Sequence, residues 1–369
     1  MTIGIVGAGQ LGRMLALAGV PLGLDFLFLD RSADVPAGAL APLLVGEFTD
    51  RALLRRLARR CEVLSFDWEN ISVASLRAAT RGLRTRISPP LRALSTGQDR
   101  LAEKRLFERL RIPTTRCAAV SSLATLKRAC QRIGMPGVLK TRRLGYDGKG
   151  QAVIRKPADI AAAWQALGGA PLLYEEFIDF DLEVSALGVR ARDGREAHYP
   201  LTRNWHDGGI LRLSIAPWKS AALSAQARRH LRAVLREFRY VGTLAIEFFV
   251  RDGRLIANEL APRVHNSGHW TIEGAVTSQF ENHLRAIAGL PLGDTAAVGH
   301  AAMINLIGRM PAAASVLSQP GVHLHDYGKQ PRPGRKLGHC TLVSARADDR
   351  NQRTRDLLRH LAVSLAGAP

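Results

Sequence analysis

Two glutamates in neighbouring apolar segments form the clearest pair of chemical groups in the sequence. Glu247 lies within the apolar run at 244–250, and Glu259 lies near the end of the run at 255–260. The Asp-Gly pair between the runs is typical of a β-hairpin turn, so the two runs predict paired strands. A carboxylate inside an apolar strand costs free energy unless it is compensated. We expect a divalent cation to compensate both acids, with separate arginine partners as the alternative.

The register of this hairpin decides whether the two carboxylates meet. A two-residue loop at 252–253 pairs Glu247 with Asn258. A three-residue loop or a bulge instead pairs Glu247 with Glu259, at roughly 5 Å between their Cβ atoms. Facing carboxylates repel each other, and a divalent cation relieves that repulsion. Hard oxygen ligands together with substrate phosphates suit Mg²⁺.

The segment at 140–151, KTRRLGYDGKGQ, concentrates glycines and cationic side chains in one short stretch. The pattern predicts a strand, a glycine loop and a second strand, which differs from the strand–loop–helix of a P-loop. Backbone N–H groups and cations in such a loop can converge on a polyphosphate. Lys140 falls in an apolar strand, where its charge needs a partner. An ordinary hairpin turn with surface cations is the alternative.

Two further segments carry polar groups that suit an anion. The segment at 261–270, APRVHNSGHW, directly follows the second glutamate strand. His265 and His269 could bind a metal together only if they lay one turn apart on a helix, and Ser267 and Gly268 disfavour a helix there. We therefore expect the segment to bind an anion, with a simple loop as the alternative. The turn at 331–336, PRPGRK, is either a phosphate site or a solvated cluster of cations.

The first glycine segment, GAGQLG at 7–12, follows an apolar strand and precedes a helical pattern. With Asp30 closing the next strand, it satisfies the dinucleotide-binding fingerprint in full. Its physical content is narrower, because glycines at a helix N-terminus allow close approach of any anion. We therefore favour a phosphate ligand other than NAD, with a purely structural turn as the second interpretation.

The elements that must position these groups fall into three regions. Strands and helices alternate up to about residue 90, which predicts a parallel sheet. The expected strands there are 3–6, 26–29 and 63–66, and the expected helices are 10–18 and 52–58. A mixed α+β region follows, with a helix at 99–110 and strands at 138–140, 152–154, 172–175 and 183–189. Beyond Gly289 we expect short strands and turns, closed by a helix near 355–365.

Composition bounds the class of protein. The chain has 369 residues and a formal net charge of +20, but its arginines are scattered and no nucleic-acid-binding signature accompanies them. We therefore expect a solvated basic surface and no nucleic-acid partner. The four cysteines are far apart, which predicts neither a zinc site nor a disulfide framework and fits a cytoplasmic protein. No signal peptide or membrane span is expected.

With these residues in place, the chain resembles the ATP-grasp superfamily and, within it, the family of 5-(carboxyamino)imidazole ribonucleotide synthases. The resemblance runs from about residue 3 to about residue 345. It rests on segments that occur in order along the chain, namely GIVGAGQLGRM, WENI, SPPLRALSTGQDRLAEK, LGYDGKGQ, EEFIDFDLEVS, YPLTRNWHDGGILR, ELAPRVHNSGHWT and PGRKLGH. The last two are especially specific to the family.

The resemblance implies an ATP-grasp fold of mixed α/β and α+β class. The N-terminal Rossmann-like domain would span 1–96 and the ATP-grasp domain 97–290, with a central nucleotide-binding subdomain at about 115–185. A small C-terminal domain would span 291–369. Three positions depart from the family pattern: Leu144 and Arg111 replace glycines, and Trp68 precedes Glu69 in place of another residue.

The resemblance also implies a role for each group of residues. The catalytic residues would be Arg263, His265, Asn266 and Asp147. The metal ligands would be Glu247 and Glu259. The ribonucleotide would contact Gly9, Gln10, Leu11, Arg335 and Lys336. The ATP site would comprise Arg100, Lys140, Gly145, Tyr146, Asp147, Gly148, Lys149, Gly150, Gln151, Glu175, Glu176, Phe177, Ile178, Glu183, His206, Asn258 and Glu259.

The implied reaction is the ATP-dependent carboxylation of aminoimidazole ribonucleotide by bicarbonate, in purine biosynthesis. ATP and Mg²⁺, with Mn²⁺ as a substitute, are the expected cofactors, and a homodimer is the expected assembly. Formate-dependent glycinamide ribonucleotide transformylase, another ATP-grasp enzyme, is the first alternative. An NAD-dependent oxidoreductase is the second, and it rests on the first glycine segment alone.

Overall fold

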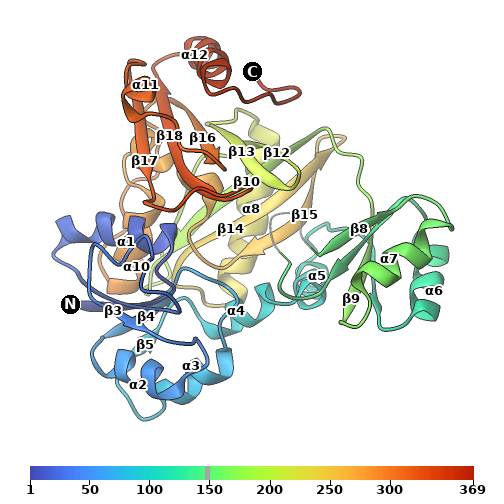
Figure 1. Ribbon diagram of the computed structural model, residues 1–369, viewed down its shortest axis with the longest axis horizontal. Helices are drawn as coiled ribbons and strands as arrows, with labels where there is room; N and C mark the ends of the chain where they lie inside the picture. Colours follow the sequence, from blue (N-terminus) through green and yellow to red (C-terminus); the bar gives the residue numbers. More distant parts are fainter. Residues whose placement is uncertain (146–149) are drawn as a thin grey trace.

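A computed structural model describes residues 1–145 and 150–369, and these residues form three β-sheets with helices packed around them (Figure 1). The two glycine segments and the paired glutamates belong to different sheets. The packing of the three sheets against one another therefore determines which of the predicted site residues lie close together.

The N-terminal sheet is parallel throughout, as the alternating pattern predicted. Its order is β3-β2-β1-β4-β5. The strands are β1 (Thr2–Val6), β2 (Asp25–Asp30), β3 (Leu43–Val45), β4 (Val63–Phe66) and β5 (Arg86–Ile87), and the helices are α1 (Gln10–Gly19), α2 (Arg51–Arg59) and α3 (Val73–Thr80), with a 3₁₀ turn at Val20–Leu22. Buried apolar side chains of β1 and α1 pack in one cluster with those of α10 (Gln279–Ala288). This sheet is thus joined to the remainder of the molecule through its core.

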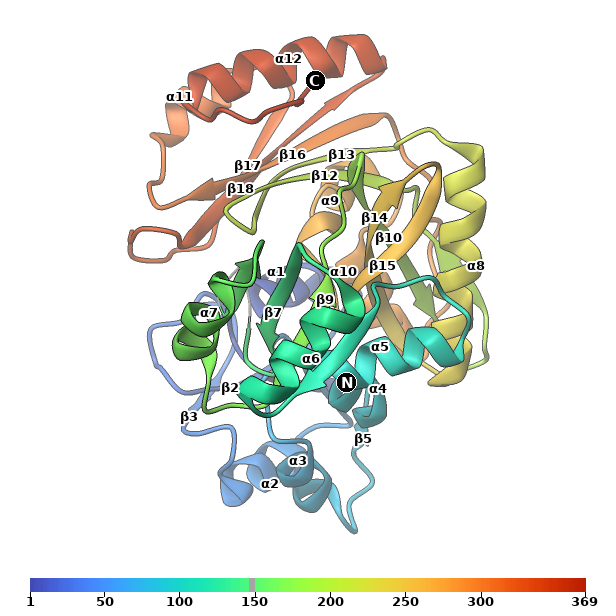
Figure 2. The same cartoon turned by 90° about the vertical axis from the view of Figure 1, so that its right-hand side faces the viewer.

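A four-stranded antiparallel sheet forms a lobe that projects from the rest of the molecule (Figures 1 and 2). Its order is β6-β9-β7-β8, with β6 (Cys117–Val120), β7 (Gly137–Thr141), β8 (Gln151–Ile154) and β9 (Leu172–Glu176). Helices α6 (Leu123–Ile133) and α7 (Asp159–Leu167) share one apolar cluster with it. Two helices, α4 (Leu91–Gly97) and α5 (Arg100–Arg109), connect the N-terminal sheet to this lobe.

The third sheet is antiparallel and has nine strands. Its order is β15-β14-β10-β12-β13-β16-β18-β17, with β11 paired to β10. The strands are β10 (Leu182–Arg190), β11 (Glu196–His198), β12 (Thr202–Asp207), β13 (Ile210–Ala216), β14 (Gly242–Arg251), β15 (Arg254–Ala261), β16 (His300–Ile307), β17 (Val322–Asp326) and β18 (Lys336–Ser344). Its helices are α8 (Ala221–Glu237), α9 (Thr271–Gly274), α11 (Ala313–Leu317) and α12 (Ala347–His360), with a 3₁₀ turn, η2, at Asn266–Gly268.

The C-terminal strands continue this sheet, because β13 pairs with β16 residue by residue. The sheet therefore crosses the expected boundary at 290/291, and the domain limits given above remain a proposal.

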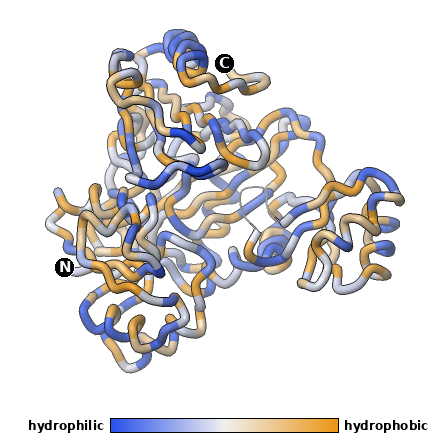
Figure 3. The backbone as a smooth tube through the Cα atoms, viewed as in Figure 1, coloured by the Kyte–Doolittle hydropathy of each residue, from blue (hydrophilic) through white to orange (hydrophobic). Residues whose placement is uncertain are grey.

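The closing helix α12 begins at Ala347, earlier than expected. The helix is largely hydrophilic (Figure 3), and the buried residues of its first two turns are the polar Arg350 and Thr354. An apolar pattern could not reveal these turns. No helix among the described residues is long and apolar enough to cross a membrane.

Two of the departures from the family pattern have a conformational consequence. Arg111 has φ of 56° and Leu144 has φ of 64°, which is the left-handed region that glycine adopts without strain. The backbone at both positions therefore keeps the shape that glycine favours, although a side chain is present.

The first glycine segment is closed by carboxylates of the protein itself. Asp67 accepts hydrogen bonds from the N–H groups of Gly9 at 2.7 Å and Gly12 at 3.1 Å, and Asp30 accepts one from Ala8 at 2.7 Å. Burial raises the pKa of Asp67 to about 6, although these two N–H donors act to lower it. An internal carboxylate thus takes the position at the α1 N-terminus where a dinucleotide phosphate binds in the fingerprint fold.

We expect Gly7→Ala to lower stability more than Gly23→Ala. Both glycines have positive φ, 95° and 68°, so both substitutions should cost about 1–2 kcal/mol in backbone strain. A Cβ at Gly7 would also lie 1.7 Å from Asp67 Oδ1, whereas nothing lies within 4 Å of a Cβ at Gly23. Urea unfolding of the two variants measures the difference. Equal losses would mean that Asp67 does not fill the glycine turn.

Candidate active site

A β-bulge brings the two predicted metal ligands face to face. Arg251 pairs with Arg254 and Phe248 with Ala257, but the next pair is Glu247 with Glu259. The extra residue on β15 is Asn258. Of the registers that the sequence left open, the bulged one is therefore the one that forms, and bulges of this kind often re-aim a side chain near an active site.

Helix α5 and the segment after it hold the bulge through its backbone. Lys104 donates from Nζ to the carbonyl oxygens of Asn258 at 3.0 Å and Ala257 at 3.4 Å. Glu103 accepts the N–H of Leu260, and Thr114 donates to the Ala257 carbonyl at 2.7 Å. Burial raises the pKa of Glu103 to about 8. Backbone groups at the bulge thus receive hydrogen-bond partners from outside the hairpin.

The facing carboxylates are only partly compensated by the protein. Arg100 lies 3.5 Å from Glu259 Oε2, and His265 Nε2 lies 3.6 Å from Glu247 Oε1. Burial raises the pKa of Glu247 to about 7, with His206 opposing the rise and the Glu259 charge adding to it. A pair of hard carboxylates whose charges oppose each other fits a divalent cation that also binds phosphate oxygens.

A buried ion cluster lies beside this pair. Glu175 is 2% exposed and sits between the ammonium groups of Lys140 and Lys104, with Lys104 Nζ at 3.2 Å. Thr115 also donates to Glu175, at 2.6 Å. Burial opposes ionisation of Glu175, but the two lysines outweigh it and lower the pKa of this carboxyl. Burial lowers the pKa of Lys140 in spite of Glu175. The partner predicted for Lys140 is therefore this glutamate.

The rest of the predicted hinge, at the end of β9 and just beyond it, makes other contacts. Glu176 pairs with Arg116 at 2.9 Å on the surface. Phe177 is exposed and Ile178 is buried. Contact of this segment with an adenine would therefore fall to backbone groups and to the Phe177 ring.

Glu183 and His206, predicted to bind nucleotide, form a hydrogen-bonded pair. The two side chains lie on neighbouring strands β10 and β12, with His206 Nδ1 2.8 Å from Glu183 Oε2. Burial acts to lower the pKa of His206, but the hydrogen bond to Glu183 and the charge of Glu247 outweigh it and the pKa is raised. The pair is therefore coupled electrostatically to Glu247, one of the two predicted metal ligands.

The loop after β15 presents polar groups at the same place. Arg263 pairs with Glu69 at 2.8 Å. Asn266 is partly buried, and neither its amide nitrogen nor its amide oxygen has a hydrogen-bond partner among the described residues. Buried amides are normally satisfied, so this amide is suited to a polar ligand.

The C-terminal cationic turn reaches the first glycine segment. Lys329 donates to Gln10 Oε1 at 2.5 Å, and burial lowers the pKa of Lys329 to about 8, with the Arg335 charge contributing. The charge of Lys336 acts on Glu247, His206 and His265. Lys329 thus links Gln10 to the cationic turn, because the charges of Arg335 and Lys336 both act on it. The N–H of Gly9 is committed to Asp67, and Leu11 is buried.

Four predicted residues of the second glycine loop, Tyr146, Asp147, Gly148 and Lys149, lie outside the described residues. The ends of the loop are described. Arg100 donates to the Gly145 carbonyl at 3.4 Å, and Gln151 pairs with Lys140 across the β7–β8 hairpin, which also brings Gly150 to Thr141. The two strands predicted on either side of this segment are confirmed.

Sequence reasoning missed five charged residues of the site. They are Asp67, Glu69, Glu103, Lys104 and Lys329. For Glu103 and Lys104 a signal was present, because Lys104 is three residues from both the apolar Leu101 and Phe107 on α5 and so falls on its buried face. A lysine on the apolar stripe of a helix needs a partner.

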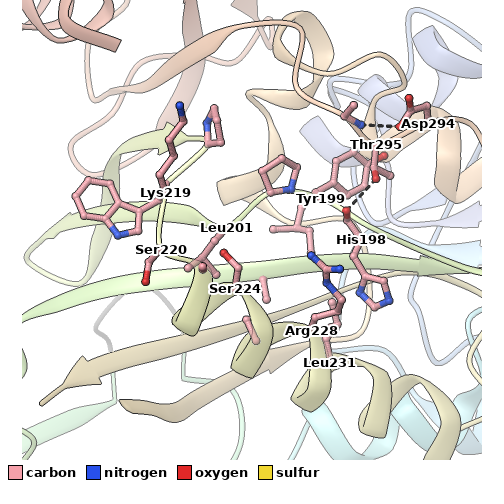
Figure 4. Close-up of a pocket in the computed structure, with 18 residues that line it drawn as sticks. His198, Tyr199, Leu201, Lys219, Ser220, Ser224, Arg228, Leu231, Asp294 and Thr295 are labelled. Carbon is pink, nitrogen blue, oxygen red and sulfur yellow. Dashed lines mark hydrogen bonds between the residues drawn. The ribbon is translucent and has the colours of Figure 1, made fainter. Parts of the chain in front are cut away.

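A cavity of about 670 Å³ is lined by a different set of residues (Figure 4). It is bounded by α8, β10 and the segments before α8 and β16. Leu201 and Leu231 contribute apolar surface, Lys219 and Arg228 contribute cations, and His198 contributes an imidazole ring. None of the predicted site residues that the structure describes lines it.

Three successive segments of the chain match known protein families. Residues 1–98 match the ribonucleotide synthetase preATP-grasp domain, and residues 105–280 match the ATP-grasp domain. Residues 301–353 match the phosphoribosylaminoimidazole carboxylase C-terminal domain.

Individual relatives match nearly the whole chain. The N5-carboxyaminoimidazole ribonucleotide synthase of Pseudomonas aeruginosa is 50% identical over 345 residues, covering 94% of this chain and 95% of its own. The crystal structure of the synthetase from Thermus thermophilus has a TM-score of 0.93 and 49% identity, covering 98% of both chains. The synthase of Aspergillus clavatus in complex with ADP and 5-aminoimidazole ribonucleotide has a TM-score of 0.91 and 28% identity, covering 98% of both chains.

We expect Glu247→Gln to stabilise the metal-free protein, increasingly so as the pH rises. Folding raises the pKa of this carboxyl from 4.5 to about 7, so its charge destabilises the folded state above pH 4.5 and does so fully above pH 7. The gain should be on the order of 1–3 kcal/mol at pH 8 and shrink toward pH 5.

Chemical unfolding in the presence of a chelator at pH 5 and pH 8 measures this gain. Glu47→Gln, at an exposed acid, serves as the matched control and should change stability little at either pH. A gain of equal size at both pH values would contradict repulsion and burial at Glu247.

Proposed function

The chain belongs to the N5-carboxyaminoimidazole ribonucleotide synthase family of ATP-grasp ligases, and from that premise we propose how its own residues carry out the family reaction. The reaction is the ATP-dependent carboxylation of 5-aminoimidazole ribonucleotide by bicarbonate. It yields N5-carboxyaminoimidazole ribonucleotide, ADP and phosphate in purine biosynthesis. The observation that carries the proposal is the pairing of Glu247 with Glu259 across the β15 bulge, beside two buried lysines.

Bicarbonate is a poor electrophile, and phosphorylation by ATP converts it to carboxyphosphate. Phosphoryl transfer needs alignment and neutralised charge rather than covalent help from the protein. Glu247 and Glu259 would hold Mg²⁺, or Mn²⁺ in its place, and the ion when bound would neutralise phosphate charge. The carboxyphosphate, or carbon dioxide released from it, then meets the exocyclic amine of the ribonucleotide.

The nucleotide residues have distinct tasks in this proposal. Arg100 and Lys140 contact the phosphates and the base of ATP, and Glu183 accepts hydrogen bonds from the ribose hydroxyls. The backbone of 175–178 contacts the adenine. His206 and Asn258 complete the site, since His206 pairs with Glu183 and Asn258 is the bulged residue beside Glu259. The loop at 145–151 covers the phosphates and excludes water from the reactive intermediate.

The acceptor side of the site uses a different set of groups. Arg263, His265 and Asn266 hold bicarbonate and the carboxyphosphate formed from it; the unsatisfied Asn266 amide supports this. Asp147, Arg335 and Lys336 contact the ribonucleotide, with the segment at 9–11 nearby. The N–H of Gly9 is already bonded to Asp67. Gln10 is therefore the residue of that segment whose side chain can contact the ribonucleotide.

The assembly and compartment are proposed on separate grounds. A homodimer is proposed from the family resemblance. The cytoplasm is proposed because Cys61, Cys117, Cys130 and Cys340 are all free thiols in the structure, which fits a reducing compartment.

We expect Glu259→Ala to abolish ADP formation that depends on bicarbonate and 5-aminoimidazole ribonucleotide. Loss of one of two facing oxygen ligands removes the cation position and leaves phosphate charge uncompensated. Phosphate release from ATP, with each substrate omitted in turn, is the measurement. Glu47→Ala, at an exposed acid, should retain turnover.

The same assay separates the alternatives. If formate and glycinamide ribonucleotide, rather than bicarbonate and aminoimidazole ribonucleotide, drove phosphate release, the transformylase would be the correct assignment. Titration calorimetry with NADH and with ATP tests the oxidoreductase assignment, which would be correct if NADH bound and ATP did not. Full turnover by Glu259→Ala would remove the metal assignment.

A further inference from the structure

A chain of buried hydrogen bonds runs through the third sheet to His265. Ser214 donates from its hydroxyl to Asn204 Oδ1 at 2.8 Å, and Asn204 Nδ2 donates to Ser185 Oγ at 3.1 Å. Ser185 donates to Ser267 Oγ at 2.7 Å, and Ser267 Oγ lies 2.8 Å from His265 Nδ1. All four polar side chains before the histidine are buried. The chain therefore links β13, β12, β10 and η2 to a predicted catalytic residue.

One backbone group fixes the direction of this chain. The N–H of Ser267 points at His265 Nδ1, 3.3 Å away. A backbone N–H can only donate, so Nδ1 must present its lone pair. If Nδ1 carried a proton instead, two hydrogens would face each other. Reversing the amide of Asn204 would reverse the side-chain bonds, but it could not turn this N–H into an acceptor.

The hydroxyl bonds agree with the backbone. Because Ser267 Oγ accepts from Ser185, its own hydrogen is free for His265 Nδ1. The peptide of His265 is also held in place, since its N–H donates to Gln279 Oε1 at 2.9 Å and its carbonyl accepts from Gln279 Nε2 at 2.6 Å. Both the proton position and the orientation of the ring are thereby set.

We propose that the Ser214–Asn204–Ser185–Ser267 chain positions His265 as a neutral imidazole protonated on Nε2, so that it acts as a hydrogen-bond donor at the reaction centre. Nε2 is the atom that faces the metal pair, 3.6 Å from Glu247 Oε1. Its N–H is available to an oxygen of bicarbonate or of the phosphoryl group during transfer, where developing charge is stabilised by oriented donors. His265 consequently does not serve as the base that takes a proton from the ribonucleotide amine. This role rests on the proposed function.

The direct test is the tautomer of His265 in the metal-free, ligand-free protein. Histidine labelled with ¹⁵N reports which ring nitrogen carries hydrogen through its chemical shifts and its couplings to the ring protons. We expect the signal that disappears in His265→Gln to show Nε2 protonated and Nδ1 unprotonated at pH 8. A signal with Nδ1 protonated, or with both nitrogens protonated, would overturn the inference.

Substitutions along the hydrogen-bond chain add a graded test. Ser267→Ala removes the hydroxyl that bonds to Nδ1, and Ser185→Ala removes the donor that orients it. We expect a change in the His265 ¹⁵N shifts that is larger for Ser267→Ala, together with a fall in kcat of about tenfold, the equivalent of one hydrogen bond. The KM for ATP should change little, because the ATP contacts are untouched. Ser185→Cys, which keeps a weak donor of similar shape, should recover part of the loss.

Ser65→Ala is the matched control for loss of a buried serine–histidine bond. Ser65 lies 3.1 Å from His283 Nε2 in the interior, and His283 Nδ1 accepts the N–H of Thr243 at 3.1 Å. This variant should lose stability comparably but leave the His265 signal and kcat unchanged. If Ser65→Ala changed kcat as much as Ser185→Ala does, the hydrogen-bond chain would contribute to stability alone and would not position His265.

The two proposals fail in different ways. If wild-type protein released no phosphate with bicarbonate and aminoimidazole ribonucleotide, the proposed function would fail whatever the tautomer. If turnover were present but His265 carried its proton on Nδ1, only the positioning chain would be wrong.

Discussion

The structure depends on one extra residue in one strand. Without Asn258 as a bulge, β15 would place Asn258 opposite Glu247 and turn Glu259 to the other face of the sheet. With it, two carboxylates face each other. Like charges at this distance repel, so the bulge needs support from outside the strand, and α5 supplies it through Glu103 and Lys104.

The same pairing of charges extends across the interior. The net charge of +20 suggests a protein defined by its basic surface, yet the groups that matter are few, buried and paired. Glu175 lies between two lysines, and Glu69 pairs with Arg263. Removing either partner of a buried pair leaves an uncompensated charge, which is far more costly than the pair itself. Such pairs keep cations in place for a phosphate-rich ligand.

Sequence patterns could predict the elements, but not which partner each charge would take. The alternating pattern gave the parallel sheet, and Asp-Gly with its flanking apolar runs gave the β14–β15 hairpin. The hairpin register stayed open because a bulge adds one residue without altering the apolar pattern. The role of Asp67 could not be foreseen, since a motif fitted for a dinucleotide phosphate is equally satisfied by a carboxylate from the segment just after β4. Long-range pairing of that kind has no local signature.

One ammonium group ties the separate parts of the site together. Lys104 belongs to α5, pairs with Glu175 of the projecting lobe, and donates to Asn258 on the nine-stranded sheet. The lobe is therefore connected through this side chain to the bulge that aims Glu259, and Arg100 makes a second connection, since it donates to the Gly145 carbonyl and lies 3.5 Å from Glu259 Oε2. The position of the lobe and the geometry of the carboxylate pair therefore share one buried ammonium group.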